Sequence, residues 1–185
     1  MDEKGTKGTK GTKGTEGMEG TEGTKGIVSD IERYANGVAL LKQALSEVPP
    51  EAMKWRPGPG KWSVHEIICH CADSETNAAM RIRYLAGEAA PVIAGYDQDR
   101  WAREFDYHSL PLEPALQQVA SVRGWTTHFL KSLPQSAWNR SGTHTEMPGT
   151  SYTASLWLSI YSEHLEIHAA QIRRTLAEWR NRGAK

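Results

Sequence analysis

The chain has 185 residues, and its 22 lysines and arginines balance its 22 aspartates and glutamates. This balance excludes the strongly basic surface that is typical of nucleic-acid-binding proteins. No apolar run reaches the length of a membrane span, and the first residues lack the apolar segment of a signal peptide. The two cysteines, Cys69 and Cys71, are too close in sequence to cross-link distant segments. We therefore expect a cytoplasmic protein that binds neither nucleic acid nor a membrane.

Residues 1–26 differ in composition from the rest of the chain. From Gly5 to Gly26 a glycine recurs at every third position, and the positions between hold Thr, Lys and Glu with a single Met18. The period resembles that of collagen, but the tract has no proline and few triplets. Because almost no apolar side chain is available for burial, nothing offsets the entropy cost of ordering this backbone. We predict a disordered tail over residues 1–26 and one domain over residues 27–185.

Two helices are predicted in the first half of that domain. Residues 28–48 carry apolar side chains at steps of three and four, the pattern of an amphipathic helix, and two prolines follow. After a loop rich in proline and glycine, Ser63 and Glu66 form the sequence pattern of a capping box. This pattern predicts a second helix that starts at Ser63 and ends near Gly87. The connection over residues 87–111 is long for a compact domain, and a short helix is predicted within it over residues 97–103.

Two further helices complete the predicted fold. Apolar stripes of helical period cover residues 113–133 and a segment from Tyr152 or Thr153 to Arg180. A loop over residues 134–150 joins them. Strand patterns are nearly absent, because no alternating run of β-branched residues is bounded by turns. The sequence therefore predicts an all-α protein, a four-helix bundle with one or two long connections.

Three histidines on the second and fourth predicted helices are candidate metal ligands. His164 and His168 are four residues apart, so their imidazoles lie one turn apart on the same helix face. His168 interrupts an apolar stripe, and His70 borders the apolar face of the second helix, so all three can point toward the bundle interior. Three neutral nitrogen donors leave a coordination position open for water or substrate, as catalytic metal sites require. The alternative is that each histidine is a hydrogen-bonded packing residue, because spacing alone does not establish that they converge.

Other residues are candidates for the chemistry around such a site. Glu66 and His144 are predicted to take part in proton transfer, His144 from a loop that could close over the pocket. Trp62, Tyr96 and Trp101 are predicted to form the apolar wall of a substrate pocket, the alternative being that they pack over the bundle mouth.

Four carboxylates lie within a turn of the histidines, and one of them could orient an imidazole through its distal nitrogen: Asp73, Glu75, Glu163 and Glu166. A zinc motif of the type His-Glu-x-x-His is excluded, because a cysteine stands at the second histidine position after His65. We expect both cysteines to be small buried residues, and His108 and His128 to lie at the surface.

Several of these segments together resemble the DinB-like (DinB/YfiT) superfamily of bacterial metal-binding four-helix bundles. The resemblance covers about residues 27–175 and rests on four motifs: Pro57-Gly58-Pro59-Gly60-Lys61-Trp62-Ser63, then Cys69-His70-Cys71-Ala72-Asp73-Ser74-Glu75, then Trp138-Asn139-Arg140 with His144 and Gly149, and His164-x-x-x-His168 followed by Gln171-Ile172.

The resemblance implies that His70, His164 and His168 bind a divalent ion, zinc in the first place and nickel or iron as alternatives. It also implies an enzyme that acts on a small-molecule substrate, either a hydrolase or an S-transferase that uses a low-molecular-weight thiol. A homodimer is expected by analogy with relatives. Ala170 stands where related sulfoxide synthases have a glutamate, which argues against their iron–oxygen chemistry. The alternative function is a non-catalytic, stress-related bundle with a structural metal or none.

Overall fold

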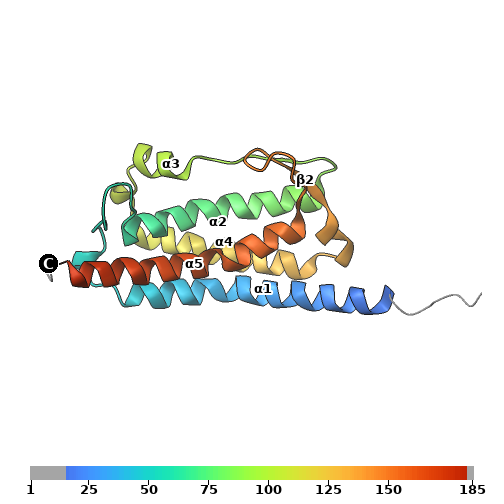
Figure 1. The fold of residues 1–185 in the computed structure, drawn as a ribbon, viewed down its shortest axis with the longest axis horizontal. Helices are drawn as coiled ribbons and strands as arrows, with labels where there is room; N and C mark the ends of the chain where they lie inside the picture. Colours follow the sequence, from blue (N-terminus) through green and yellow to red (C-terminus); the bar gives the residue numbers. More distant parts are fainter. Residues whose placement is uncertain (1–15, 183–185) are drawn as a thin grey trace, which may run out of the picture.

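The computed structural model describes residues 16–182, and it contains the predicted four-helix bundle. Its long helices are α1 (Glu16–Ser46), α2 (Val64–Gly87), α4 (Leu112–Ser132) and α5 (Ala154–Asn181). Figure 1 shows them running side by side. α1 begins well before the predicted start at residue 28 and therefore includes the second half of the glycine repeat. Residues 1–15 of the predicted tail lie outside the described residues, so the tail and the domain boundary at residue 26 stay predictions.

Capping side chains begin two of the helices, and the capping box of the first was predicted from the sequence. The hydroxyl of Ser63 accepts the backbone N–H of Glu66, and the Glu66 carboxylate accepts the backbone N–H of Ser63, which completes the capping box of α2. At α5 the hydroxyl of Thr153 accepts the backbone N–H of Leu156 at 3.0 Å. These side chains satisfy donors that a helix start leaves unpaired, which explains why the sequence located both starts closely.

Helices that follow one another along the chain are not always neighbours in this bundle. α1 packs mainly against α5 and α4, and α2 packs mainly against α4 and α5. α1 and α2 therefore lie on one diagonal of the bundle, with α4 and α5 on the other. This arrangement requires connections longer than the tight turns of a simple up-and-down bundle.

The two longest connections lie together along α2, on the side away from α1 (Figure 1). The first contains β1 (Val92–Ile93), α3 (Gln98–Glu104) and the short 3-10 helix η2 (Tyr107–Ser109). The second contains the 3-10 helix η3 (Gln135–Asn139), β2 (Ser141–His144) and β3 (Tyr152–Thr153), and a further 3-10 helix, η1 (Pro50–Ala52), follows α1. α3 matches the short helix that the sequence predicted.

A small sheet in the order β1-β2-β3 was not expected from the sequence. β1 pairs in parallel with β2, and β2 pairs antiparallel with β3. Strands of two to four residues are too short to show an alternating pattern, so only the pairing across the two connections reveals them. Gly142 lets β2 lie close to the residue before β1, because a Cβ at Gly142 would lie 2.3 Å from the carbonyl oxygen of Pro91.

A layer of polar side chains divides the bundle core into two apolar clusters. One cluster surrounds Leu41 and Ile172, and the other surrounds Ile82 and Trp157. His164 lies at this layer, on the turn of α5 between Tyr161 of one cluster and Leu165 of the other, with Glu75 of α2 and Arg123 of α4 beside it. Among the helices of residues 16–182, none combines the length and the apolarity that crossing a bilayer demands.

Candidate metal centre

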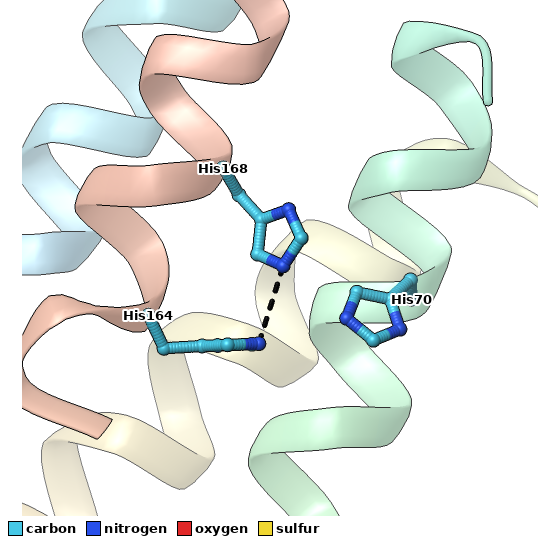
Figure 2. Close-up of side chains that lie close together, drawn as sticks. All are labelled: His70, His164 and His168. Atoms are coloured by element: carbon cyan, nitrogen blue, oxygen red, sulfur yellow. Dashed lines mark hydrogen bonds between the residues drawn. The ribbon is translucent and has the colours of Figure 1, made fainter. Parts of the chain in front are cut away.

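His70, His164 and His168 converge between α2 and α5, as the sequence predicted. One ring nitrogen from each lies within 4.8 Å of the others. Figure 2 shows His164 and His168 one turn apart on α5, with His70 facing them from α2. His70 and His168 are buried, and His164 is 16% exposed.

In both histidines of α5, the ring nitrogen Nδ1 faces a hydrogen-bond acceptor. Nδ1 of His164 lies 3.3 Å from Oε1 of Glu75, and Nδ1 of His168 lies 2.9 Å from Oε1 of Gln171. An oxygen that only accepts selects the tautomer with hydrogen on Nδ1, so each Nε2 carries a lone pair. The two Nε2 atoms face each other at 3.2 Å. The hydroxyl of Ser74 lies 3.3 Å from Nε2 of His164, where it can donate to that lone pair.

Two of the histidines, His70 and His168, are held in their neutral form by their surroundings. Burial lowers the pKa of His168 to about 4, and the neighbouring His164 adds to the effect. Burial lowers the pKa of His70 still further, with contributions from His168 and His164. Neutral imidazole is the form that binds a metal ion.

The residues fit a divalent ion. Two nitrogens bound to one tetrahedral zinc at about 2.0–2.1 Å lie about 3.3 Å apart, close to the 3.2 Å between the Nε2 atoms of His164 and His168. Without a cation, two lone pairs would face each other at that distance. The third ring, His70, has a buried Nδ1 with no hydrogen-bond partner among the described residues, which is costly for a buried polar group.

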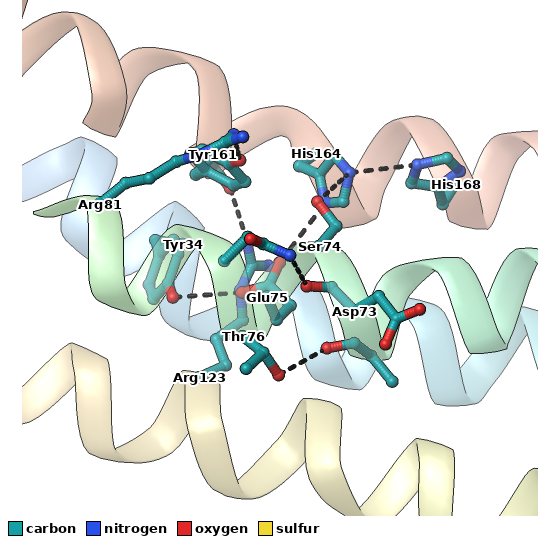
Figure 3. A network of polar contacts seen from close by, with 12 residues as sticks. Tyr34, Asp73, Ser74, Glu75, Thr76, Arg81, Arg123, Tyr161, His164 and His168 are labelled. Atoms are coloured by element: carbon teal, nitrogen blue, oxygen red, sulfur yellow. Dashed lines mark hydrogen bonds and ion pairs between the residues drawn. The ribbon is translucent and has the colours of Figure 1, made fainter. Parts of the chain in front are cut away.

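A buried carboxylate supports His164 from behind. Glu75 is fully buried and also accepts hydrogen bonds from the Tyr34 hydroxyl at 3.2 Å and from Nε of Arg123 at 3.1 Å (Figure 3). Burial alone would raise the pKa of Glu75, but the charge of Arg123 and the hydrogen bonds from His164 and Tyr34 outweigh it and lower that pKa. The carboxylate is therefore ionised where it meets the imidazole.

A polar cavity of about 550 Å³ opens beside two of the histidines. Arg81 lies in its wall, where one guanidinium nitrogen donates to the Tyr161 hydroxyl at 2.9 Å and another donates to the Ala94 carbonyl. Asp97, Asp99 and Glu146 are the acidic members of the lining. The whole lining consists of eleven residues: His70, Ser74, Arg81, Tyr96, Asp97, Gln98, Asp99, Glu146, Ile160, Tyr161 and His164. A small molecule in this cavity would contact His70 and His164 directly.

The three aromatic residues predicted for a substrate pocket lie in different surroundings. Tyr96 lines the cavity, and Trp101 stacks on it with 4.3 Å between the ring centroids. Trp62 packs on the ring of His70 at 4.7 Å between centroids. Trp62 thus covers His70 and Tyr96 lines the cavity, while Trp62 and Trp101 both pack against the small apolar cluster of Cys69, Ala102 and Tyr107.

The two residues predicted for proton transfer are not in the cavity lining. The Glu66 carboxylate is buried, completes the capping box of α2 and forms an ion pair with Arg56. His144 packs against Tyr152, and its Nδ1 accepts the backbone N–H of Glu146 at 3.2 Å. A proton-transfer role for either residue stays a prediction.

Sequence reasoning missed several residues that now belong to the site or its support. The roles of Arg81, Arg123 and Tyr34 had no local signal, because each depends on a partner from another helix or loop. His108 was expected at the surface, but it is half-buried, with Nε2 at 2.8 Å from the Ser63 hydroxyl. His128 is exposed as expected, and both cysteines are buried.

Known proteins resemble this chain in sequence and in fold. The family model of the DinB superfamily matches residues 34–172. A protein of Oceanobacillus iheyensis named "Putative metal-dependent hydrolase OB0782" is 31% identical over 133 residues, which are 72% of this chain and 76% of that protein. A protein of Geobacillus thermodenitrificans, also named "Putative metal-dependent hydrolase", is 29% identical over 137 residues, or 71% of this chain and 74% of its own.

A solved structure has the same bundle. YfiT from Bacillus subtilis, described as "a probable metal-dependent hydrolase with an unusual four-helix bundle topology", aligns with a TM-score of 0.74 at 24% identity. The alignment covers 80% of this chain and 85% of YfiT, and at this identity it shows the shared fold alone. The family match over residues 34–172 and the relative of 31% identity establish that the chain belongs to the DinB superfamily.

Proposed function

We propose that this chain is a metal-dependent hydrolase of a small molecule, with a divalent ion held by His70, His164 and His168. One observation carries the proposal. His164 and His168 each use Nδ1 for an acceptor and turn Nε2 toward the other at 3.2 Å. A shared cation turns this repulsive arrangement of lone pairs into a favourable one, and the names of two relatives agree with a metal-dependent reaction.

A divalent ion at this position supplies Lewis-acid polarisation and makes water more acidic. The residues of the chain supply the rest of the site. Glu75 and Gln171 hold the His164 and His168 rings in one orientation through Nδ1. Trp62 packs against His70 and excludes water from that side.

The cavity wall offers hydrogen-bond donors to a substrate. Burial raises the pKa of Tyr96 to about 12, so its hydroxyl keeps its proton at neutral pH and can donate. Arg81 is oriented by Tyr161 and the Ala94 carbonyl, and it lies 5.7 Å from the centre of the Tyr96 ring. Donors of this kind stabilise the negative oxygen that develops in the hydrolysis of an ester or amide.

Two alternatives from the sequence stay open to test. Transfer of a low-molecular-weight thiol would use the same histidines, but the names of the relatives support hydrolysis. A structural metal is the second alternative. Structural zinc prefers a closed shell of four protein ligands, whereas three histidines beside an open cavity leave room for a substrate. Zinc as the ion, the homodimer and the cytoplasmic location are likewise predictions.

Element analysis of the purified protein tests the proposal first. We expect about one divalent ion per chain, lost in His70→Ala, His164→Ala and His168→Ala. His128→Ala is the matched control, because His128 is exposed on α4 and outside the cluster. Hydrolysis of a panel of small esters and amides should disappear with the metal and return when it is restored. A His168→Ala protein with stoichiometric metal and full turnover would contradict the proposal.

A chelator separates the catalytic role from the structural one. We expect removal of the ion from a catalytic site to abolish hydrolysis and leave the bundle folded, because the two apolar clusters of the core consist of other residues than the histidines. Unfolding on chelation, with no hydrolysis of any panel member by the metal-loaded protein, would support the structural alternative.

A further inference from the structure

The layer between the two apolar clusters holds a buried ion pair that lies directly behind His164. Glu75 of α2 and Arg123 of α4 have side chains that are 0% and 1% exposed, and Nε of Arg123 lies 3.1 Å from Oε2 of Glu75. The other carboxylate oxygen, Oε1, is the one that faces Nδ1 of His164. One carboxylate oxygen of Glu75 thus contacts the guanidinium of Arg123, and the other contacts His164, a proposed metal ligand.

Other groups hold the guanidinium of Arg123 in place. It lies over the Tyr34 ring, with Cζ at 4.0 Å from the ring centre, and it donates to the Tyr161 carbonyl. Gly37 of α1 provides the space, because a Cβ there would lie 2.1 Å from Nη1 of Arg123. Burial of an ion pair costs solvation energy, so apolar residues of similar volume would stabilise the bundle at least as much as the pair does. Stability alone therefore does not explain the pair.

We propose that Glu75 is a positioning residue that sets the tautomer and orientation of His164, and that buried Arg123 keeps Glu75 in place for this purpose. The proposal rests on the proposed function, since His164 is one of the three ligands. The two histidines of α5 then differ in the group that accepts the hydrogen bond from Nδ1. His164 faces a carboxylate with its own buried counter-ion, whereas His168 faces the neutral amide of Gln171.

The first experiment observes His164 in the metal-free protein by long-range ¹H–¹⁵N correlation NMR. In the wild type we expect the Nδ1–H tautomer, because Glu75 Oε1 can only accept. In the double variant Glu75→Leu/Arg123→Met the acceptor is absent, and we expect a shift toward Nε2–H. The double variant replaces the ion pair with apolar side chains of similar size and so keeps the core filled.

The second experiment measures zinc affinity by competition with a chromogenic chelator. We expect Glu75→Leu/Arg123→Met to lose about 10–100-fold in affinity, the usual cost of removing a group that orients a metal-bound histidine. Glu75→Gln should lose affinity too, and it retains the shape of the side chain if the double variant proves unstable. Thr126→Val is the control, because Thr126 is fully buried on the same helix as Arg123 and its hydroxyl has no hydrogen-bond partner among the described residues, so its affinity should stay close to wild type.

The results separate this inference from the proposed function. A wild type that binds no zinc or other divalent ion overturns the proposed function, while the tautomer of His164 still decides the role of Glu75. Wild-type zinc affinity in both Glu75 variants, together with an unchanged Nδ1–H tautomer in the double variant, would overturn the inference and leave the three-histidine site intact. Equal losses of zinc affinity in Thr126→Val and the Glu75 variants would show that the effect comes from general loosening of the core, and would also overturn the inference.

Discussion

Gly37 of α1 lies directly against the guanidinium of Arg123. A Cβ at Gly37 would lie 2.1 Å from Nη1 of Arg123 and 3.0 Å from Cβ of Leu165. Gly37→Ala should therefore displace Arg123 and destabilise the protein by about 1–3 kcal/mol, as overpacking of a core does. Chemical denaturation measures the change.

A second helical glycine provides the control for Gly37. Gly124 lies on α4, and a Cβ added there would meet no atom of the described residues within 4 Å beyond its own helix backbone and chain neighbours. Gly124→Ala should stabilise the protein by about 0.4–1 kcal/mol, because alanine lowers the entropy of the unfolded chain. Similar effects of the two substitutions would contradict a specific contact between Gly37 and Arg123.

The stability of the metal-free protein should fall as the pH drops. The folded-state pKa of His168 is lowered to about 4 from an ordinary value of 6.5. Between these values the unfolded chain binds a proton that the folded chain does not, so stability rises with pH in this window and is lost as pH decreases through it. The full effect corresponds to about 3 kcal/mol for His168. Denaturation at several pH values, after chelation, measures the slope.

The source of that slope can be tested by substitution. His168→Leu removes the titrating group, so the metal-free variant should lose less stability between pH 6.5 and pH 4 than the wild type does. An identical slope in the variant would show that other groups cause the acid sensitivity.

Gln171 should contribute to metal affinity through His168. Its Oε1 accepts from Nδ1 of His168 at 2.9 Å. Gln171→Leu removes this acceptor and is expected to weaken zinc binding about 10–100-fold. Gln171→Glu retains an acceptor and should bind zinc at least as tightly as the wild type. Competition titrations with a chelator compare the three proteins, and equal affinities would refute the role.

Trp101 should affect substrate use and leave the metal in place. It stacks on Tyr96, which lines the cavity beside His70 and His164. Trp101→Ala removes this support, so kcat/KM for a hydrolysed panel substrate should fall while the metal content stays unchanged. Trp125→Ala on α4, where the side chain is 69% exposed, is the control and should alter neither quantity. Loss of metal in Trp101→Ala would point to a structural role.

The fold was largely predictable because helix signals are local. The capping box at Ser63 and Glu66 placed the start of α2, and the apolar stripe of helical period placed the start of α5 near Thr153. The small sheet was missed, because its strands gain their hydrogen bonds from each other across two long connections. The diagonal placement of α1 and α2 likewise depends on how whole helices pack.

The site was predictable only in part. The spacing of His164 and His168 indicated a shared face, and the surrounding motifs added His70. Glu66 was a candidate for proton transfer because it is a carboxylate near these residues, but its place at a helix start already gives it partners in Ser63 and Arg56. A side chain that completes a capping box is directed back to the start of the helix, and Glu66 there lines a different, smaller cavity together with Arg56 and Trp62.

By itself, the sequence determined the helices and the three histidines, because helical periodicity and caps act between residues a few positions apart. Only the tertiary structure decided which nitrogen each imidazole presents and what holds it there. Glu75 is separated from Arg123 by 48 positions and from His164 by 89. Such contacts form only when α2, α4 and α5 pack together and exclude water, which strengthens the interactions among the buried charges and makes an unpaired one costly.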